Sequence, residues 1–365
     1  MSPEDFELLR ELTIVLPTYN RLLELEQTIE YWRDLPVTVH ILDGTSEPRF
    51  QEGQLFGTRS IYYHHFPTPK GADPSHNAFE RFVFAASLPQ TKYATLCCDD
   101  DFYTVSGLVK SLKCLENSDR IDAVVGSTLS YSKKNNKLYW YFHYRGRANK
   151  QLETASIEEK VSTSLTWFLY AVCKTSIWRQ FITTSYEKKE FTKTQFEAHE
   201  WIMVILSKAM FRTKYLQIIS QIRQVTIKGA NKRPEIPWIH WINNPNNHLL
   251  VSEVVGQLAK GFNFVSSPAD YKKNLRLAKD LVSEEQISSN RKQTQSFNQV
   301  LRRICSGLAF KLMPNLRVFS DRPHQLKDSW EMLDATGLSY DRRELQEIND
   351  LLLTPRQELR LRADI

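Results

Sequence analysis

Three consecutive carboxylates follow a short, strand-like run in the stretch YATLCCDDDFY, residues 93 to 103. Asp99, Asp100 and Asp101 repel one another when ionised, and holding them at the end of a buried strand costs free energy. A divalent cation would offset that cost, because Mg²⁺ and Mn²⁺ take carboxylate oxygens and complete their coordination with water and phosphate oxygens. The alternative is an acidic turn in which an aspartate caps the next helix. Three acids exceed what capping requires, so the pattern favours a cation site.

The acids need a scaffold, and the N-terminal half of the chain alternates strand-like with helix-like segments. The alternation comprises strands at 12–20, 37–45, 60–66 and 93–98 and helices at 21–35, 74–88 and 104–116, with Asn20 as the expected N-cap of the first helix. This order predicts a layered α/β domain with a mostly parallel sheet. Ligands bind such sheets at the carboxyl ends of the strands, where Thr18, Asp43 and the three acids fall.

The rest of the chain is expected to extend this domain and then change character. The sequence predicts a hairpin around KKNN, a strand leading into a short helix at 166–178, a helix at 196–210 and a strand at 215–227. From about residue 246 the chain becomes richer in Lys, Ser, Gln and helix formers. We therefore expect an α/β domain over 1–245 and a mainly helical C-terminal region over 246–365.

Composition narrows the class of protein. Lys and Arg outnumber Asp and Glu by 48 to 42 over 365 residues, and no long basic run concentrates the net charge of +6, so a dedicated nucleic-acid binder is disfavoured. The five cysteines form no CxxC pair. Neither a signal-peptide core nor an apolar run of about 18 residues is present. We expect a cytoplasmic protein, and the mildly basic surface also suits the inner face of a membrane.

Three motifs, TIVLPTYNR, ILDGTSEP and YATLCCDDDF, occur in this order, and no glycine-rich phosphate loop accompanies them. On these motifs, residues 11–228 resemble the inverting GT-A glycosyltransferases of the large family 2, and the DDDF form resembles a bacterial subgroup. The resemblance implies a GT-A fold and sugar transfer with inversion from a nucleotide-diphosphate donor, with Mn²⁺ or Mg²⁺ as cofactor, and a UDP-linked sugar is the donor we expect. It implies a glycan or glycoconjugate acceptor, in surface polysaccharide or glycoconjugate assembly.

The resemblance also assigns roles around the nucleotide. Pro17, Thr18 and Tyr19 match the loop beside the base, and Asp43 matches the acid that contacts the base or ribose. The family's second strand usually ends in two acids, whereas this chain keeps one. Arg223, in the strand after the 196–210 helix, could reach a phosphate or the acceptor, and a packing role is equally open.

For the metal, the resemblance implies that Asp101 is a ligand and that Asp99 touches the ribose or serves as a second ligand. Asp100 lies between them and could take either role. Cys98 occupies a position at which the family often has an acid. His240, in a loop rich in Pro and Asn, could supply a further metal ligand.

Inversion requires a general base that takes the proton of the acceptor hydroxyl, and a carboxylate is the usual choice. In the family this acid begins a helix whose pattern is two acids, Trp and apolar residues. FEAHEWIMVIL fits when it is matched on Trp201, which places Glu200 at the base position and His199 at that of the preceding acid. Glu197 is the second candidate, because a three-residue step puts it on the same helix face.

Two other classes of function fit parts of this pattern. A nucleotidyltransferase or phosphotransferase would also cluster acids around a divalent ion, but it is expected to carry a lysine- or glycine-rich phosphate loop. A non-catalytic binding or scaffold protein would use the C-terminal helices. Those helices could pack on the α/β domain, form a homo-oligomer or contact a membrane peripherally, and all three roles stay open.

Overall fold

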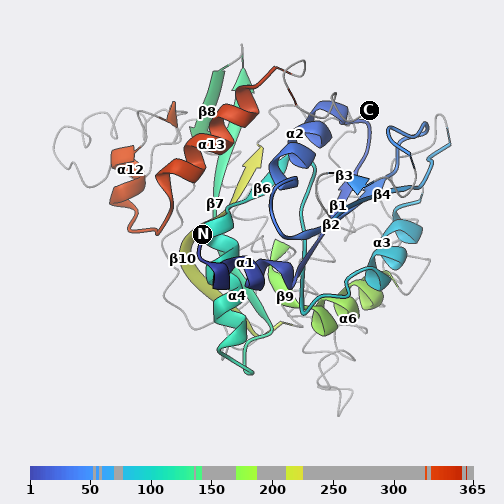
Figure 1. Ribbon diagram of the computed structural model, residues 1–365, viewed down its shortest axis with the longest axis horizontal. Coiled ribbons are helices and arrows are strands. Elements are labelled where there is room, and N and C mark those ends of the chain that lie inside the picture. Colours follow the sequence, from blue (N-terminus) through green and yellow to red (C-terminus); the bar gives the residue numbers. More distant parts are fainter. Residues whose placement is uncertain are drawn as a thin grey trace, which may run out of the picture.

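The computed structural model describes most of the N-terminal α/β region and a short C-terminal part. The described residues are 1–51, 55–56, 60–69, 77–134, 137–141, 170–186, 211–224, 325–326, 330–355 and 359. Over these residues the chain forms one mixed sheet of ten strands flanked by helices (Figure 1). Among them, no helix is both long enough and apolar enough to cross a bilayer.

The strands follow the order β3-β4-β2-β1-β5-β9-β7-β10-β6 across the sheet, and β8 pairs with β7. Their bounds are β1 Leu12–Thr18, β2 Thr38–Asp43, β3 Leu55–Phe56, β4 Ile61–His65, β5 Tyr93–Leu96, β6 Asp101–Tyr103, β7 Ala123–Lys134, β8 Lys137–Tyr141, β9 Val172–Lys174 and β10 Thr213–Gln224. The helices are α1 Pro3–Arg10, α2 Leu22–Trp32, α3 Ala78–Ser87, α4 Val105–Glu116, α6 Thr175–Tyr186, α12 Trp330–Ala335 and α13 Arg342–Leu353.

The domain is α/β as predicted, but its sheet is mixed and contains both parallel and antiparallel pairs. The run β4-β2-β1-β5 is parallel throughout, because helices α2 and α3 provide the crossovers that parallel pairing needs. Beyond β5 the directions are mixed: β9 is antiparallel to both β5 and β7, β10 is parallel to β7, and β6 is antiparallel to β10. The predicted hairpin is confirmed, since β7 and β8 pair antiparallel from Lys134↔Lys137 onward.

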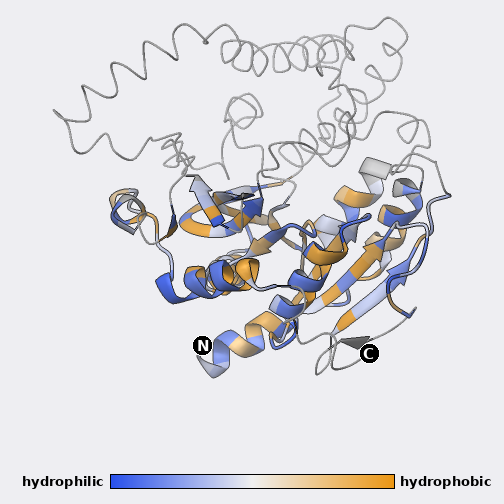
Figure 2. Ribbon diagram, turned by 90° about the horizontal axis from the view of Figure 1, so that it is seen from above, coloured by the Kyte–Doolittle hydropathy of each residue, from blue (hydrophilic) through white to orange (hydrophobic). Residues whose placement is uncertain are grey.

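Apolar periodicity explains how the helices attach to the sheet. In α2, Leu25, Ile29 and Trp32 recur at steps of four and three residues and are all buried. Strand β1 is buried along nearly its whole length, as expected for a central parallel strand covered on both faces. In Figure 2 the strands carry mainly apolar residues, while the helices beside them carry both kinds. The predicted strands at 12–20, 37–45, 60–66 and 93–98 and helices at 21–35, 74–88 and 104–116 are confirmed, with ends that differ by a few residues.

The start of α2 differs from the prediction in one respect. Arg21, not Asn20, occupies the N-cap position, and its side chain makes no capping hydrogen bond. Asn20 instead adopts a positive φ of 56°, a conformation that asparagine tolerates better than most residues, and its N–H donates to Thr45 Oγ1 at 3.1 Å. This left-handed residue turns the chain sharply between β1 and α2 and leaves the Arg21 side chain available for the acids.

The C-terminal part packs on the same sheet. The α13 side chains of Leu345, Ile348 and Leu352 join Phe102 and Trp140 in a second hydrophobic core. Figure 1 shows α13, in red, lying beside β8 and α2, and contacts connect it to both. The described C-terminal elements are the helices α12 and α13, and an isolated bridge joins Ile218 to Ser339. The predicted boundary near residue 245 lies outside the described residues.

Candidate functional site

The end of β1, the end of β2 and the acidic turn after β5 meet at one edge of the sheet. Thr18 and Asp43 are register partners on adjacent parallel strands, and Gly44 N–H donates to the Thr18 carbonyl at 3.0 Å. Thr18 Oγ1 in turn donates to Asp99 Oδ2 at 2.7 Å. The predicted convergence of Thr18, Asp43 and the acids is therefore present in the structure. Pro17 lies within β1 and Tyr19 directly after it, and both are half-buried.

Asp43 accepts hydrogen bonds from Thr45 and Tyr63. Its Oδ1 accepts from Thr45 N at 2.8 Å and from Thr45 Oγ1 at 2.5 Å, and its Oδ2 accepts from the Tyr63 hydroxyl at 2.7 Å. The residue is fully buried, so each carboxylate oxygen depends on these donors. Asp43 thus fixes the loop after β2, and its contact with a nucleotide stays a prediction.

Asp99 faces the start of α2. In addition to the bond from Thr18, its Oδ1 accepts from Arg21 Nη1 at 3.0 Å, and the same nitrogen lies 2.5 Å from Asp100 Oδ2. One guanidinium therefore offsets part of the charge of two acids. Burial nevertheless raises the pKa of Asp99 to about 7, and the Asp100 charge adds to this effect while Arg21 and Thr18 oppose it.

Asp101 turns to the opposite side of the acidic turn. It begins β6, pairs with Arg223 across the β6–β10 ladder, and accepts a side-chain hydrogen bond from Gln221 Nε2 to Oδ2 at 3.2 Å. Its Oδ1 is buried and has no hydrogen-bond partner among the described residues. Burial, followed by repulsion from Asp100, raises the Asp101 pKa well above its ordinary value, while Arg223 acts in the other direction.

The ligand atoms that could share one ion are those of Cys98, Asp100 and Asp101. Their sulfur and carboxylate oxygens all lie within 4.8 Å of one another. The buried Asp101 Oδ1 lacks a donor, and a divalent cation would satisfy it, so the residues present fit such an ion. Of the two aspartates that the resemblance offers as ligands, Asp101 belongs to this group. Asp99 does not, because Thr18 and Arg21 hold its carboxylate on the other side.

Further residues surround this group and were not singled out from the sequence as site residues. Tyr170 lies with its hydroxyl 3.3 Å from Cys98 Sγ, and the Arg223 guanidinium carbon lies 5.6 Å from the centre of the Tyr170 ring. Gln221 shares a strand face with Arg223, two residues away, so the two-residue repeat of β10 was the signal that could have found it. Arg21 lies three residues after the end of β1, in PTYNR.

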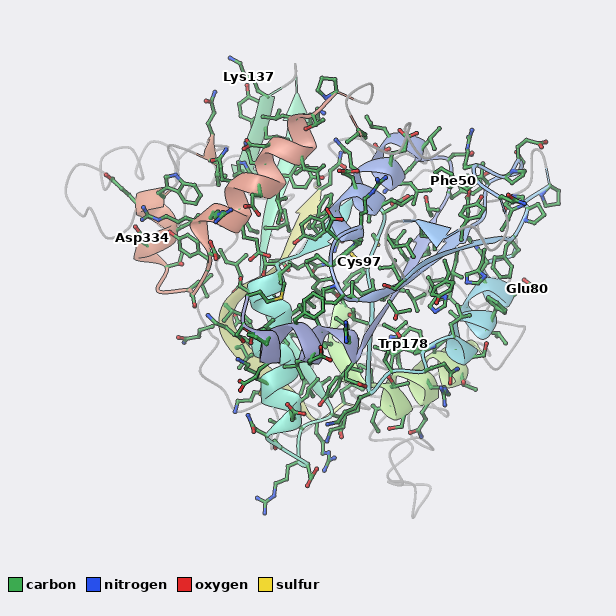
Figure 3. The ribbon with its side chains drawn as sticks, viewed as in Figure 1. Phe50, Glu80, Cys97, Lys137, Trp178 and Asp334 are labelled. Carbon is green, nitrogen blue, oxygen red and sulfur yellow. The ribbon has the colours of Figure 1, made fainter. Side chains whose placement is uncertain are left out.

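The site sits in the interior of the molecule, not on a protruding loop. Figure 3 shows Cys97, the residue that follows β5 closely, near the middle of the structure. Cys97 is fully buried and its Sγ–H donates to the Asp101 carbonyl at 3.4 Å. The acidic turn is tied down elsewhere as well, because Thr28 Oγ1 donates to the Asp99 carbonyl at 2.8 Å. Its backbone is therefore fixed from both the α2 side and the β5 side.

Three predicted site residues lie outside the described residues, namely Glu197, Glu200 and His240. Their predicted roles as general base and metal ligand stay predictions. No protein-family model matches the chain, and a search of the curated proteins found no match.

Proposed function

We propose that this chain is a metal-dependent inverting glycosyltransferase of the GT-A type, which moves a sugar from a nucleotide-diphosphate donor to a hydroxyl of a glycan or glycoconjugate. The UDP-linked sugars are the donors we favour. The observation that carries the proposal is the Asp101 carboxyl group, which is buried beside Asp100 and has one oxygen without a hydrogen-bond donor in the described part of the chain. A buried acid in this state lowers the stability of the fold. Binding a cation at the carboxyl ends of the strands, where α/β sheets bind ligands, would explain why the acid is there.

Asp100 and Asp101 would hold Mn²⁺ or Mg²⁺. When bound, the ion stabilises the negative charge that develops on the departing diphosphate. Asp99, oriented by Thr18 and Arg21, is left to accept hydrogen bonds from the ribose hydroxyls. Arg223, opposite Asp101 on β10, adds positive charge where the phosphates would lie.

Glu200 is the residue we propose as general base, with Glu197 as the second candidate. The base accepts the proton of the acceptor hydroxyl while the hydroxyl oxygen attacks the anomeric carbon, and the bond from that carbon to the diphosphate breaks. Glu200→Gln should keep UDP binding and abolish transfer. Glu197→Gln is the matched control, and a loss of transfer in that variant alone would move the role to Glu197.

A thermal-shift experiment tests the nucleotide and the ion together. UDP and Mn²⁺ are added to the full chain separately and then jointly, and ATP is added in a parallel series. The proposal predicts a joint stabilisation that exceeds the sum of the separate ones, because an ion held by Asp100 and Asp101 would also attract the diphosphate. Stabilisation by ATP alone would favour a nucleotidyltransferase or phosphotransferase. No response to any nucleotide would favour a binding or scaffold protein.

Asp101→Asn tests the observation on which the proposal rests. The variant should hydrolyse a UDP-sugar donor at least about a hundredfold more slowly in the presence of Mn²⁺, which corresponds to about 2.7 kcal/mol of activation free energy. Its fold should be intact by circular dichroism. Donor hydrolysis at the wild-type rate would contradict the assignment of Asp101 as a ligand.

A further inference from the structure

We propose that Cys98, whose thiol proton leaves to solvent when the metal binds, is the third protein ligand of the cation, so that the site prefers thiophilic divalent ions such as Co²⁺ and Zn²⁺ to Mg²⁺. The inference rests on the proposed function in one respect, namely that the acidic turn binds an ion. It goes further by naming the ligand that selects the ion.

The first support is the direction of the two adjacent cysteines. Successive residues of an extended chain point to opposite sides. Cys97 Sγ is directed to the Asp101 carbonyl, whereas Cys98 Sγ lies within 4.8 Å of carboxylate oxygens of both Asp100 and Asp101. Tetrahedral ligands at about 2.3 Å for sulfur and about 2.0–2.2 Å for oxygen lie about 3.6 Å apart on one ion. A closure of at most about 1.2 Å would therefore bring the three groups onto a shared ion.

The second support is independent of the cysteine. Asp101 Oδ1 is buried and has no hydrogen-bond partner among the described residues. The side chain is only 1% exposed, so bulk water does not compensate that oxygen. An ion placed between Asp101 and Cys98 would satisfy an atom that otherwise has no donor.

The third support is the group behind the sulfur. Tyr170 lies with its hydroxyl 3.3 Å from Cys98 Sγ and is itself buried, and Arg223 packs over its ring. A hydroxyl that donates to a coordinating sulfur orients it and balances its charge, as the outer shell of protein metal sites commonly does. Tyr170 is the positioning residue in this arrangement.

The chemical consequence is selectivity among ions. Mg²⁺ takes oxygen ligands almost exclusively, whereas thiolates favour Zn²⁺ and the later first-row ions. A site with two carboxylates and one sulfur should therefore bind Zn²⁺ and Co²⁺ more tightly than Mn²⁺, and Mn²⁺ more tightly than Mg²⁺. Replacing the sulfur by a hydroxyl should weaken the binding of the thiophilic ions and leave the binding of Mg²⁺ nearly unchanged.

The test is a titration of the full chain, freed of metal, with Co²⁺. Sulfur bound to Co²⁺ gives a near-ultraviolet charge-transfer absorption that oxygen ligands do not give. The wild type should show this band, and Cys98→Ser should lose it and bind Co²⁺ at least about tenfold more weakly. Cys114→Ser is the matched control, since Cys114 lies in α4 and is half-buried, and it should retain the band.

The outcomes separate this inference from the proposed function. A wild-type protein without the band, or a Cys98→Ser variant with an unchanged band and affinity, would overturn the thiol ligand. If Mn²⁺ still stabilised such a protein and Asp101→Asn abolished that effect, the proposed function would stand. If neither Cys98→Ser nor Asp101→Asn altered the binding of any ion, both proposals would fail. A weaker band in Tyr170→Phe, with Mg²⁺ binding unchanged, would support the positioning role of Tyr170.

Discussion

Two buried aspartates at the same edge of the sheet, Asp43 and Asp101, differ in how their oxygens are satisfied. Asp43 receives three hydrogen bonds from Thr45 and Tyr63, both within or beside its own strand and loop. Asp101 receives one side-chain hydrogen bond, from Gln221, and a backbone interaction with Gln224, while its Oδ1 has no hydrogen-bond partner among the described residues. Both are at most 1% exposed, so solvent does not explain the difference.

The difference between Asp43 and Asp101 distinguishes an acid that stabilises the fold from one available to bind a ligand. A buried carboxylate with its donors in place contributes to stability, because removing it leaves those donors unsatisfied. A buried carboxylate with too few donors opposes folding, and its retention points to a ligand. On this argument Asp43 builds the loop that shapes the site, and Asp101 is the acid that we propose as the ligand of an ion. Four measurements can break or sharpen this contrast.

The largest effect on stability is expected for Asp43→Asn. The amide turns one acceptor oxygen into a donor, which faces the hydrogens of Thr45 or Tyr63, and it removes the charge that strengthens their bonds. We expect a loss of about 2–3 kcal/mol in the free energy of unfolding, measured by urea denaturation. A variant as stable as the wild type would remove the structural role of Asp43.

Glu344 extends the comparison to a third acid, in α13. Its carboxylate accepts from Val105 N and from the backbone and hydroxyl of Ser106, at the N-terminus of α4. These donors have no partner within the helix, so Glu344→Ala should cost about 2 kcal/mol in urea denaturation. Glu347→Ala, on the same helix but exposed and paired with Arg343, is the control and should cost at most about 0.5 kcal/mol. Equal costs would mean that α13 does not cap α4.

The half-buried His40 should make the free energy of unfolding depend on pH with the opposite sign to the buried acids. Burial, followed by the neighbouring His64, lowers the pKa of His40 from 6.5 to about 4. The folded state therefore favours the neutral ring, so its contribution is fully present above pH 6.5 and is lost as the pH falls from 6.5 toward 4. After allowance for partial exposure, we expect about 1 kcal/mol between pH 6.5 and 5.

Comparison with His40→Gln isolates this contribution, because both proteins share the titration of the aspartates. The difference between their unfolding free energies should shrink as the pH falls through this range. A difference independent of pH would show that the ring does not titrate as described.

The smallest effect on stability is expected for Asp101→Asn in the absence of metal. The amide keeps an acceptor for Gln221 and removes a buried charge whose Oδ1 has no hydrogen-bond partner among the described residues. We expect the free energy of unfolding to change by less than about 0.5 kcal/mol or to rise, in contrast to the chemically identical change at Asp43. A loss as large as that of Asp43→Asn would mean that Asp101 is structural too.

Local patterns predicted much of the scaffold. The apolar repeat of Leu108, Leu112 and Leu115 indicated α4, because a helix buried on one face has apolar residues at helical spacing. The β-branched runs indicated β1 and β2, because strands buried on both faces are continuously apolar. The antiparallel insertion of β9 and the pairing of β6 with β10 were not predicted. They depend on contacts between segments more than 70 residues apart, which no local period records.

The site was predicted at the level of residues but not of contacts. The acids drew attention as a run, yet the run divides: Asp99 turns to Arg21, while Asp101 turns to Gln221. Which way each carboxylate turns depends on the backbone of the Cys97–Tyr103 turn and on donors from α2 and β10. The left-handed Asn20 that frees Arg21 for this role was mistaken for a helix cap, because asparagine suits both positions.

The most direct test of the account is the binding of Mn²⁺ to the metal-free protein, followed by the electron paramagnetic resonance signal of the unbound ion. Wild-type protein should remove Mn²⁺ from solution at a stoichiometry of one ion per chain, and Asp101→Asn should bind at least about a hundredfold more weakly. Asp43→Asn, measured at a temperature where it remains folded, should bind nearly as well as the wild type. Equal binding by wild type and Asp101→Asn, or no binding by either, would contradict the claim that Asp101 is kept for a cation.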